Sequence, residues 1–333
     1  MRAWLKRVRR VVAATFRPLR GRDVSLHAAA VTFYAGIAVV PVALLAIWIT
    51  GLIAGADRVR RMTSRTIQAL PDAIGAPHAL SVLIEAGLHL TPLLALASLL
   101  PATLYGEGLR RAFVSLREPG EQLVGWRGRI LWLPLLAAAP ALLLAAFMAL
   151  PVTTSLWVRG GWYAFGGLAL SFLAWWLVLT PVVIWVYRYI APDRPEWLAT
   201  TLVGSFTAAN LSGFLHGFVL FCSLPLKLGV PFGGFTEIGG VVAVGLWLYL
   251  FHTIVLVGYA ATVSASAYQR RRAADKATED PESRADSSDA DSSDADSSFG
   301  DGDGNEPDTE RGTEPGTGPV VAGLGQGDPA GRS

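Results

Sequence analysis

The sequence predicts an all-α fold: a polytopic membrane bundle of six transmembrane helices, with an interfacial amphipathic helix before it and a disordered acidic tail after it. The 333 residues are 52% hydrophobic, and their mean hydropathy is +0.42. A soluble globular protein rarely reaches such values. Charge is divided along the chain, because residues 1–274 carry a net charge of +14 and residues 275–333 one of −12. We therefore expect a basic cytoplasmic leader (1–24), a membrane domain (25–270) and a tail (271–333).

The leader has the pattern of a basic amphipathic helix. Across residues 3–20, apolar side chains recur at helical spacing, and arginines and a lysine fall largely between them. Such a helix lies in the membrane interface with its cations on anionic lipid headgroups. The alternative is a disordered basic leader that only sets the orientation of the protein.

The first expected span covers residues 27–53, which contain no Asp, Glu, Lys or Arg. A helix of this length crosses a bilayer core with room for tilt. His27 and Tyr34 lie two helical turns apart and share one face. Pro41 falls in the middle, where its ring kinks the helix and frees a backbone carbonyl that must find a partner in lipid. These features predict a bent helix packed against neighbours.

A polar segment follows the first span and predicts a short helical hairpin at the membrane surface. Arg58, Arg61 and Arg65 share one helical face, and Pro71 and Gly75 interrupt the segment. We expect the arginines to face lipid phosphates on the outer side.

The five remaining spans are expected at residues 88–105, 130–150, 162–189, 197–224 and 238–266. In the fifth span, small residues recur every four positions, which is typical of close helix–helix approach. These are Ser205, Ala209, Gly213 and Gly217. Prolines predict kinks in four of the six spans, at positions 41, 92, 101, 134, 140 and 181. Broken helices are common in transporters, yet proline is also frequent in ordinary membrane helices.

The distribution of basic residues predicts that both termini are cytoplasmic. With six spans and the N-terminus inside, the inner segments near the membrane hold 19 Lys and Arg and the outer loops hold six. This bias follows the positive-inside rule. We therefore expect a multi-pass protein of the cell membrane.

Motifs at both ends of the membrane domain resemble the YihY/BrkB family. The first span carries Ala28-Ala29-Ala30, Phe33-Tyr34 and Pro41 in the order of that family's opening signature. The sixth span follows Gly233-Gly234 and carries Trp247-Leu248-Tyr249 before Gly258, as in the family's last helix. There the family usually continues with an acidic residue, whereas this chain has Tyr259, so no role of that carboxylate carries over. The resemblance spans residues 20–270 and implies a six-helix inner-membrane protein linked to serum resistance.

Polar groups inside the spans are the best candidates for function, because burying them in lipid is costly. Asn210, His216 and His252 lie deepest, and Asn210 and His252 could instead make ordinary hydrogen bonds within the bundle. Glu107 lies nearer a helix end and is spaced for pairing with Arg110 and Arg111. That group is a surface ion pair or, together with Arg188, a gate or headgroup site. The full candidate set is Tyr34, Pro41, Glu107, Arg110, Arg188, Asn210 and His252.

No motif points to an enzyme, a cofactor or a metal. The five histidines are scattered, and the chain has no Walker A loop and no Gly-x-Ser-x-Gly elbow. Cys222 is the only cysteine, so no intramolecular disulfide can form. The family was once labelled ribonuclease BN, but a nuclease needs a basic groove with acid–base groups or a metal. Here the charges lie at helix ends, and we expect no nucleic-acid partner.

Two functions remain open from the sequence. Kinked helices and intramembrane polar groups favour a transporter or a lipid-handling envelope protein. The alternative is a non-transporting scaffold that recruits a cytoplasmic partner through the acidic tail. That tail repeats Ala-Asp-Ser-Ser and has too few apolar residues to fold alone. Membrane lipids are the expected partners, and the sequence leaves open whether the protein forms an oligomer.

Overall fold

The computed structural model describes residues 23–68, 76–117, 126–158, 161–224 and 226–292, and it confirms an all-α fold with six membrane spans. The spans are α2 (Val24–Ala54), α5 (Pro92–Ser115), α6 (Arg127–Val158), α7 (Gly161–Trp185), α8 (Trp197–Ser223) and α9 (Thr236–Ser292). Two shorter helices, α3 (Ala56–Gln68) and α4 (Ala76–Leu88), lie between the first and second spans. A π-helix, η3 (Val186–Ile190), continues α7, and a 3-10 turn, η4 (Val230–Phe232), precedes α9.

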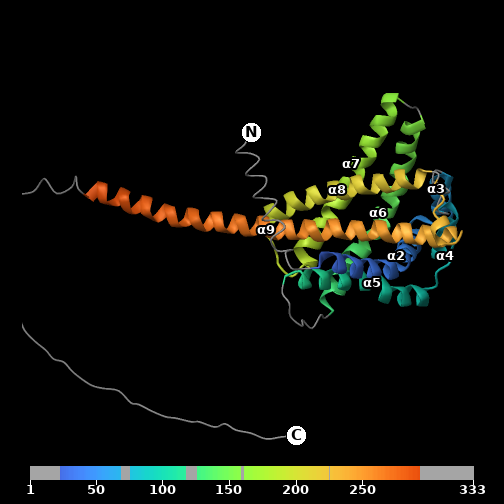
Figure 1. Cartoon of the computed structure of the whole chain (residues 1–333), viewed down its shortest axis with the longest axis horizontal. Coiled ribbons are helices and arrows are strands. Elements are labelled where there is room, and N and C mark those ends of the chain that lie inside the picture. Colours follow the sequence, from blue (N-terminus) through green and yellow to red (C-terminus); the bar gives the residue numbers. More distant parts are fainter. Residues whose placement is uncertain (1–22, 69–75, 118–125, 159–160, 225, 293–333) are drawn as a thin grey trace, which may run out of the picture. The chain divides into compact units, whose positions relative to one another are not determined.

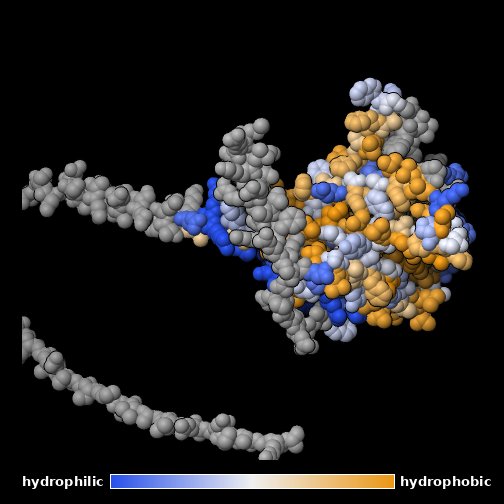
Figure 2. Space-filling model, viewed as in Figure 1, coloured by the Kyte–Doolittle hydropathy of each residue, from blue (hydrophilic) through white to orange (hydrophobic). Residues whose placement is uncertain are grey.

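Within the membrane domain, α2 lies beside α5, and α8 lies beside α9 (Figure 1). Ring contacts between Phe214 of α8 and Trp247 of α9 hold the second pair together at a centroid distance of 4.3 Å. Apolar side chains cover much of the visible face of the bundle (Figure 2). Such a face suits a lipid environment, because lipid tails solvate apolar side chains.

Helix α9 extends past residue 270, where the predicted membrane domain ends. The predicted disordered tail begins at residue 271, whereas α9 continues to Ser292. Residues 271–280 are rich in Ala, Arg, Lys and Glu, which favour helix, and they extend a helix that is already nucleated. The chain divides into compact units over residues 1–277 and 278–333. The predicted interfacial helix at 3–20 and the rest of the tail from residue 293 lie outside the described residues.

Helix α5 begins and ends later than the predicted second span. Thr91 caps its first turn, accepting a hydrogen bond from the Leu94 N–H, and Pro92 is the first helical residue. Pro92 therefore starts a helix and does not kink one, because a proline at that position loses no hydrogen bond. The helix continues ten residues past position 105 because Ala112 and Phe113 are buried in the bundle.

A helix cap and a glycine set the two ends of α2. The Asp23 side chain accepts a hydrogen bond from the Leu26 N–H at 3.0 Å, which satisfies a free donor of the first turn. Gly55 has a φ of +88°, a conformation that glycine adopts without strain. This lets the chain leave α2 and enter α3 at once. Pro41 lies inside α2, as predicted.

The helices of the predicted hairpin are confirmed as α3 and α4. Val59 of α3 and Ile84 of α4 are buried in a small apolar core. Arg60 joins the two helices, because its Nε and Nη2 each lie 2.9 Å from one carboxylate oxygen of Glu85. Arg60 does not belong to the predicted face of Arg58, Arg61 and Arg65. The position of that face at the membrane surface stays a prediction.

This ion pair predicts an acid-sensitive hairpin. The Arg60 guanidinium lowers the pKa of the Glu85 carboxyl, so the pair stabilises the hairpin above the carboxyl's ordinary titration range. That stability is lost as the pH falls through the lowered pKa. We expect a small loss of protection in α3 and α4 at acid pH, measured by hydrogen exchange. The Glu85→Gln variant should show that lower protection at neutral pH and lack the acid step; an acid step retained in this variant would contradict the assignment.

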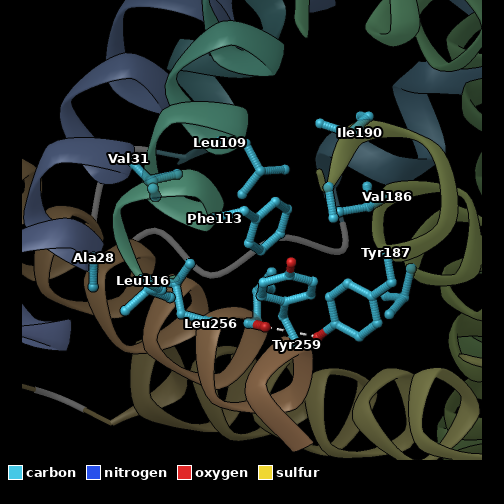
Figure 3. Close-up of a cluster of buried hydrophobic side chains, with 14 of the residues drawn as sticks. Ala28, Val31, Leu109, Phe113, Leu116, Val186, Tyr187, Ile190, Leu256 and Tyr259 are labelled. Atoms are coloured by element: carbon cyan, nitrogen blue, oxygen red, sulfur yellow. Dashed lines mark hydrogen bonds between the residues drawn. The ribbon is translucent and has the colours of Figure 1, made fainter. Parts of the chain in front are cut away.

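The largest core lies where α2, α5, η3, α8 and α9 meet. Phe113 of α5, Tyr187 of η3 and Tyr259 of α9 form its aromatic centre (Figure 3), with Phe113 and Tyr259 at a centroid distance of 4.4 Å. Tyr187 is fully buried, and its hydroxyl donates to the Val255 carbonyl at 2.7 Å. This core fixes the half of α5 that carries the charged candidate residues.

Candidate functional site

The C-terminal half of α5 contacts two neighbouring helices through glycines. Gly106 faces α6 so closely that a Cβ atom there would lie 2.6 Å from the Gly128 carbonyl oxygen. Gly108 faces α2, where a Cβ atom would collide with the ring of Tyr34. Small residues allow this close approach of helix backbones. The two glycines therefore enclose the residue between them, Glu107.

Glu107 is buried, which corrects the expectation of a surface ion pair. Its side chain is 5% exposed, and its Oε1 atom accepts a hydrogen bond from Arg111 Nε at 3.1 Å. The Oε2 atom has no hydrogen-bond partner within the described part of the chain, and it faces Gly128 at the start of α6. The partial positive charge at a helix N-terminus stabilises a nearby carboxylate. The start of α6 therefore helps to stabilise the Glu107 carboxylate in this buried position.

Arg110 does not pair with Glu107. Its Nη1 donates to the Ile190 carbonyl at 2.7 Å and so ties α5 to the end of η3. Further along, Arg117 forms an ion pair with Asp193, and Asp193 also accepts a hydrogen bond from the Tyr259 hydroxyl at 2.6 Å. Arg110 of α5 thus binds the end of η3, and Arg117, just after α5, binds the following loop and through it α9. We call the end of the bundle that holds these contacts the predicted cytoplasmic end.

Arg188 lies in η3 and is separate from the Glu107 contacts. Its Nη1 donates to the Pro195 carbonyl at 2.6 Å, and its guanidinium carbon lies 5.0 Å from the ring centre of Trp197. The predicted grouping of Arg188 with Glu107 and Arg110 therefore fails, because the guanidinium of Arg188 is directed towards the start of α8. Arg110 links the two regions through the Ile190 carbonyl.

His252 joins three helices in the interior. It is 1% exposed, its Nδ1 lies 3.1 Å from Thr32 Oγ1 of α2, and its Nε2 lies 3.0 Å from the Tyr105 hydroxyl of α5. Thr32 donates its own proton to the Ala28 carbonyl at 2.8 Å, so it accepts from Nδ1–H. Nε2 is then free to accept from Tyr105. These two partners satisfy both ring nitrogens of a neutral imidazole. His252 therefore makes the ordinary hydrogen bonds within the bundle that the sequence analysis gave as the alternative to a functional role.

Asn210 lies at a groove between α8 and α9. The groove has a volume of about 580 Å³, and its lining combines small, apolar and amide groups. The lining residues are Ala209, Asn210, Gly213, Phe214, Gly217 and Ile254. The small residues were expected to bring two backbones together. In the structure, a Cβ at Gly213 would lie 3.7 Å from the ring of Phe172 in α7, and a Cβ at Gly217 would lie 3.5 Å from the ring of Trp247 in α9. Both glycines also line the groove.

The side chain of Asn210 is only partly satisfied. Its Nδ2 donates to the Phe206 carbonyl of its own helix at 2.8 Å, and the residue is exposed. Its amide oxygen has no hydrogen-bond partner among the residues that the structure describes. An exposed amide in the middle of a span is costly in lipid unless a polar group reaches it. The groove therefore combines a cavity with a free acceptor.

The structure does not gather the predicted candidates into one site. Tyr34 packs its ring on Gly108 and so lies next to Glu107, while Pro41 lies two turns further along α2. Asn210 lies in the groove, and His252 lies in the interior.

Sequence reasoning missed the partners of His252, which are Thr32 and Tyr105, and the network that joins Arg117, Asp193 and Tyr259. Asp193 gave only a weak signal: it is the only aspartate between the fourth and fifth spans, but Arg194 beside it offers a nearby cation. Thr32 and Tyr105 gave no such signal, because their role depends on which helices are neighbours.

Six apolar spans around buried polar contacts define a polytopic helical membrane protein, and the comparison with known families gives the finer class. The family model described as virulence factor BrkB matches residues 15–285. The chain belongs to this family, which confirms the resemblance drawn from its motifs. Searches of curated proteins and of solved structures found no significant match.

Proposed function

We propose that the protein moves or handles lipid within the cell membrane and is not an enzyme. The observation that carries the proposal is the groove between α8 and α9. Its volume of about 580 Å³ lies in the range of ligand-binding cavities, about 300–1,000 Å³. It lies at mid-span, and most of its lining is apolar. Such a groove suits an acyl chain, and the free amide oxygen of Asn210 suits a polar group that passes along it.

The orientation belongs to the same proposal. Both termini lie in the cytoplasm, and the arginines of α5, η3 and the adjoining loops face that side. The count of basic residues supports this orientation. The scaffold alternative depends on the acidic tail from residue 271, of which residues 293–333 lie outside the described residues.

The test is lipid flux in proteoliposomes. Purified full-length protein is reconstituted with fluorescent phospholipids, and the loss of outer-leaflet label is followed with a membrane-impermeant quencher. Wild-type protein should accelerate lipid movement above that in empty vesicles. Gly213→Leu should reduce the rate on the order of tenfold, because Gly213 lines the groove and the new side chain takes up part of its volume. The added Cβ itself is in ordinary contact with Phe172, at 3.7 Å. Asn210→Leu should reduce the rate as well, since the only polar group of the lining is lost.

Gly166→Leu provides the matched control. Gly166 lies in α7 with no atom within 4 Å of a Cβ position, so the same substitution adds bulk to an open surface. Its flux should equal that of wild type. Equal losses in the Gly213 and Gly166 variants would reject the groove as the path. No lipid movement by folded wild-type protein would reject the proposal and favour the scaffold, which deletion of residues 293–333 then tests.

A further inference from the structure

Three aromatic rings and one guanidinium form a continuous stack where α7 ends and α8 begins. Trp185 stacks on Tyr189 at a centroid distance of 4.4 Å, and Tyr189 meets Trp197 edge to face at 6.4 Å. The guanidinium of Arg188 lies over the other end of this stack, 5.0 Å from the ring centre of Trp197. We call these four residues the α7–α8 corner.

The corner is held rigidly from both sides. The indole N–H of Trp185 donates to the Leu131 carbonyl of α6 at 3.0 Å. Arg188 is fixed by its hydrogen bond to the buried Pro195. The π-helical turn contributes as well, because its wide hydrogen bond from Ala191 N–H to the Val186 carbonyl changes the direction of the side chains within it. Groups held in this way bind a ligand with little loss of conformational entropy.

The corner is also open to a ligand. Trp197 is 52% exposed and Tyr189 is 39% exposed. One N–H of Arg188 donates to Pro195, and in the described part of the chain its other guanidinium donors have no hydrogen-bond or ion-pair partner. A planar guanidinium presents its donors in a fork that matches two oxygens of a phosphate. Trp and Tyr at the ends of spans lie at the level of lipid headgroups.

Neighbouring charges restrict what can bind. Asp193 is neutralised by Arg117, and Arg194 is an exposed second cation on the same loop. Glu196 is an exposed carboxylate next to Trp197, and its backbone N–H donates to Ser266 Oγ at 2.8 Å. A bound phosphate is thus attracted by Arg188 and opposed by Glu196. An anionic lipid should bind here more tightly than a soluble anion, because its acyl chains also contact the exposed rings.

We propose that the α7–α8 corner is a binding site for the phosphate of an anionic membrane lipid, with Arg188 as the phosphate ligand and Trp197 as the platform that holds it. The site lies at the predicted cytoplasmic end, whereas the groove lies at mid-span. The inference does not depend on lipid transport, and its test measures binding alone.

Native mass spectrometry of the full-length protein tests the site. Protein released from mixed micelles of phosphatidylglycerol and phosphatidylcholine should retain phosphatidylglycerol preferentially. Arg188→Gln should lower that affinity about tenfold, since a charge-assisted phosphate contact is lost. Arg188→Lys should fall between the two, because lysine keeps the charge but not the fork. Trp197→Ala should also weaken binding, although it leaves every charge in place.

Arg194→Gln is the matched control, because it removes an equal charge from the same loop. The affinity of this variant for phosphatidylglycerol should change by less than about twofold. Glu196→Gln should bind the lipid more tightly, because it removes a negative charge that opposes the phosphate. Equal losses for the Arg188 and Arg194 variants, or an unchanged Trp197 variant, would show diffuse attraction to a basic surface and overturn the proposal. Excess inorganic phosphate should not displace the lipid. Displacement would assign the corner to a soluble phosphate compound and overturn the lipid assignment.

Discussion

Gly106→Ala is expected to prevent stable assembly of the bundle. A Cβ atom at this position would lie 2.6 Å from the Gly128 carbonyl oxygen and closer still to the Cβ of Trp132. Neither atom is the end of a flexible side chain, so α5 and α6 must move apart. Overpacking a well-packed core costs about 1–3 kcal/mol, and we expect at least the upper value because backbone must move. Thermal unfolding in detergent, followed by size-exclusion chromatography, measures the loss.

The separation of α5 and α6 would also disturb contacts on either side of Gly106. Tyr105 packs edge to face on Trp132 at a centroid distance of 4.7 Å, and the same tyrosine donates to His252. Glu107 would lose its enclosure by Gly128. Separating α5 from α6 therefore disturbs the surroundings of both Glu107 and His252.

Gly36→Ala is the control for this prediction. Gly36 lies in α2, and no atom lies within 4 Å of a Cβ at its position. Alanine there should be neutral or stabilising by up to about 1 kcal/mol, since alanine favours helix over glycine. If both variants unfolded at the same temperature, the close contact at Gly106 would not be a determinant of the fold.

The sequence predicted the spans well because the rules for membrane helices are local. A run of about 20 apolar residues without charge specifies a span wherever its neighbours lie. The main error came from charge. The predicted second span ended at position 105, whereas α5 continues to Ser115, because Glu107 and Arg110 find partners inside the protein. A local rule treats those charges as the end of a span, and only the packed bundle shows that they are satisfied.

The sequence could single out individual polar residues as candidates, but it could not predict which of them lie together. Asn210 and His252 could be singled out as polar groups within spans, since their cost in lipid depends on residue type and depth. Glu107 was placed beyond the end of the predicted second span, whereas it lies inside α5. Their partners could not be predicted, because Thr32 and His252 are 220 residues apart in the chain. The stripe of small residues in α8 was misread for a related reason. Missing side chains allow either contact or a groove, and here Gly213 and Gly217 line a groove while rings of α7 and α9 lie within contact range of their Cβ positions.

The strongest electrostatic prediction concerns Glu107 and Arg111. Arg111→Ala should destabilise the protein by about 2 kcal/mol, because it leaves the buried carboxylate without its cation. Breaking a buried pair costs about 3–5 kcal/mol, and we expect less here because the Arg111 side chain is 50% exposed and partly screened by solvent. Glu107→Gln alone should be close to neutral, since the glutamine keeps the shape and its amide oxygen still accepts from Arg111.

The double variant distinguishes this explanation from a loss of packing. With Glu107→Gln and Arg111→Ala combined, no charge is left buried, and stability should return to within about 1 kcal/mol of wild type. Thermal unfolding of the four proteins gives the coupling energy of the pair. If Arg111→Ala were equally harmful with Glu or Gln at position 107, the arginine would act through its aliphatic stem. A restored double variant would instead show that the arginine acts through its contact with the Glu107 carboxylate, whose Oε2 atom has no hydrogen-bond partner in the described part of the chain.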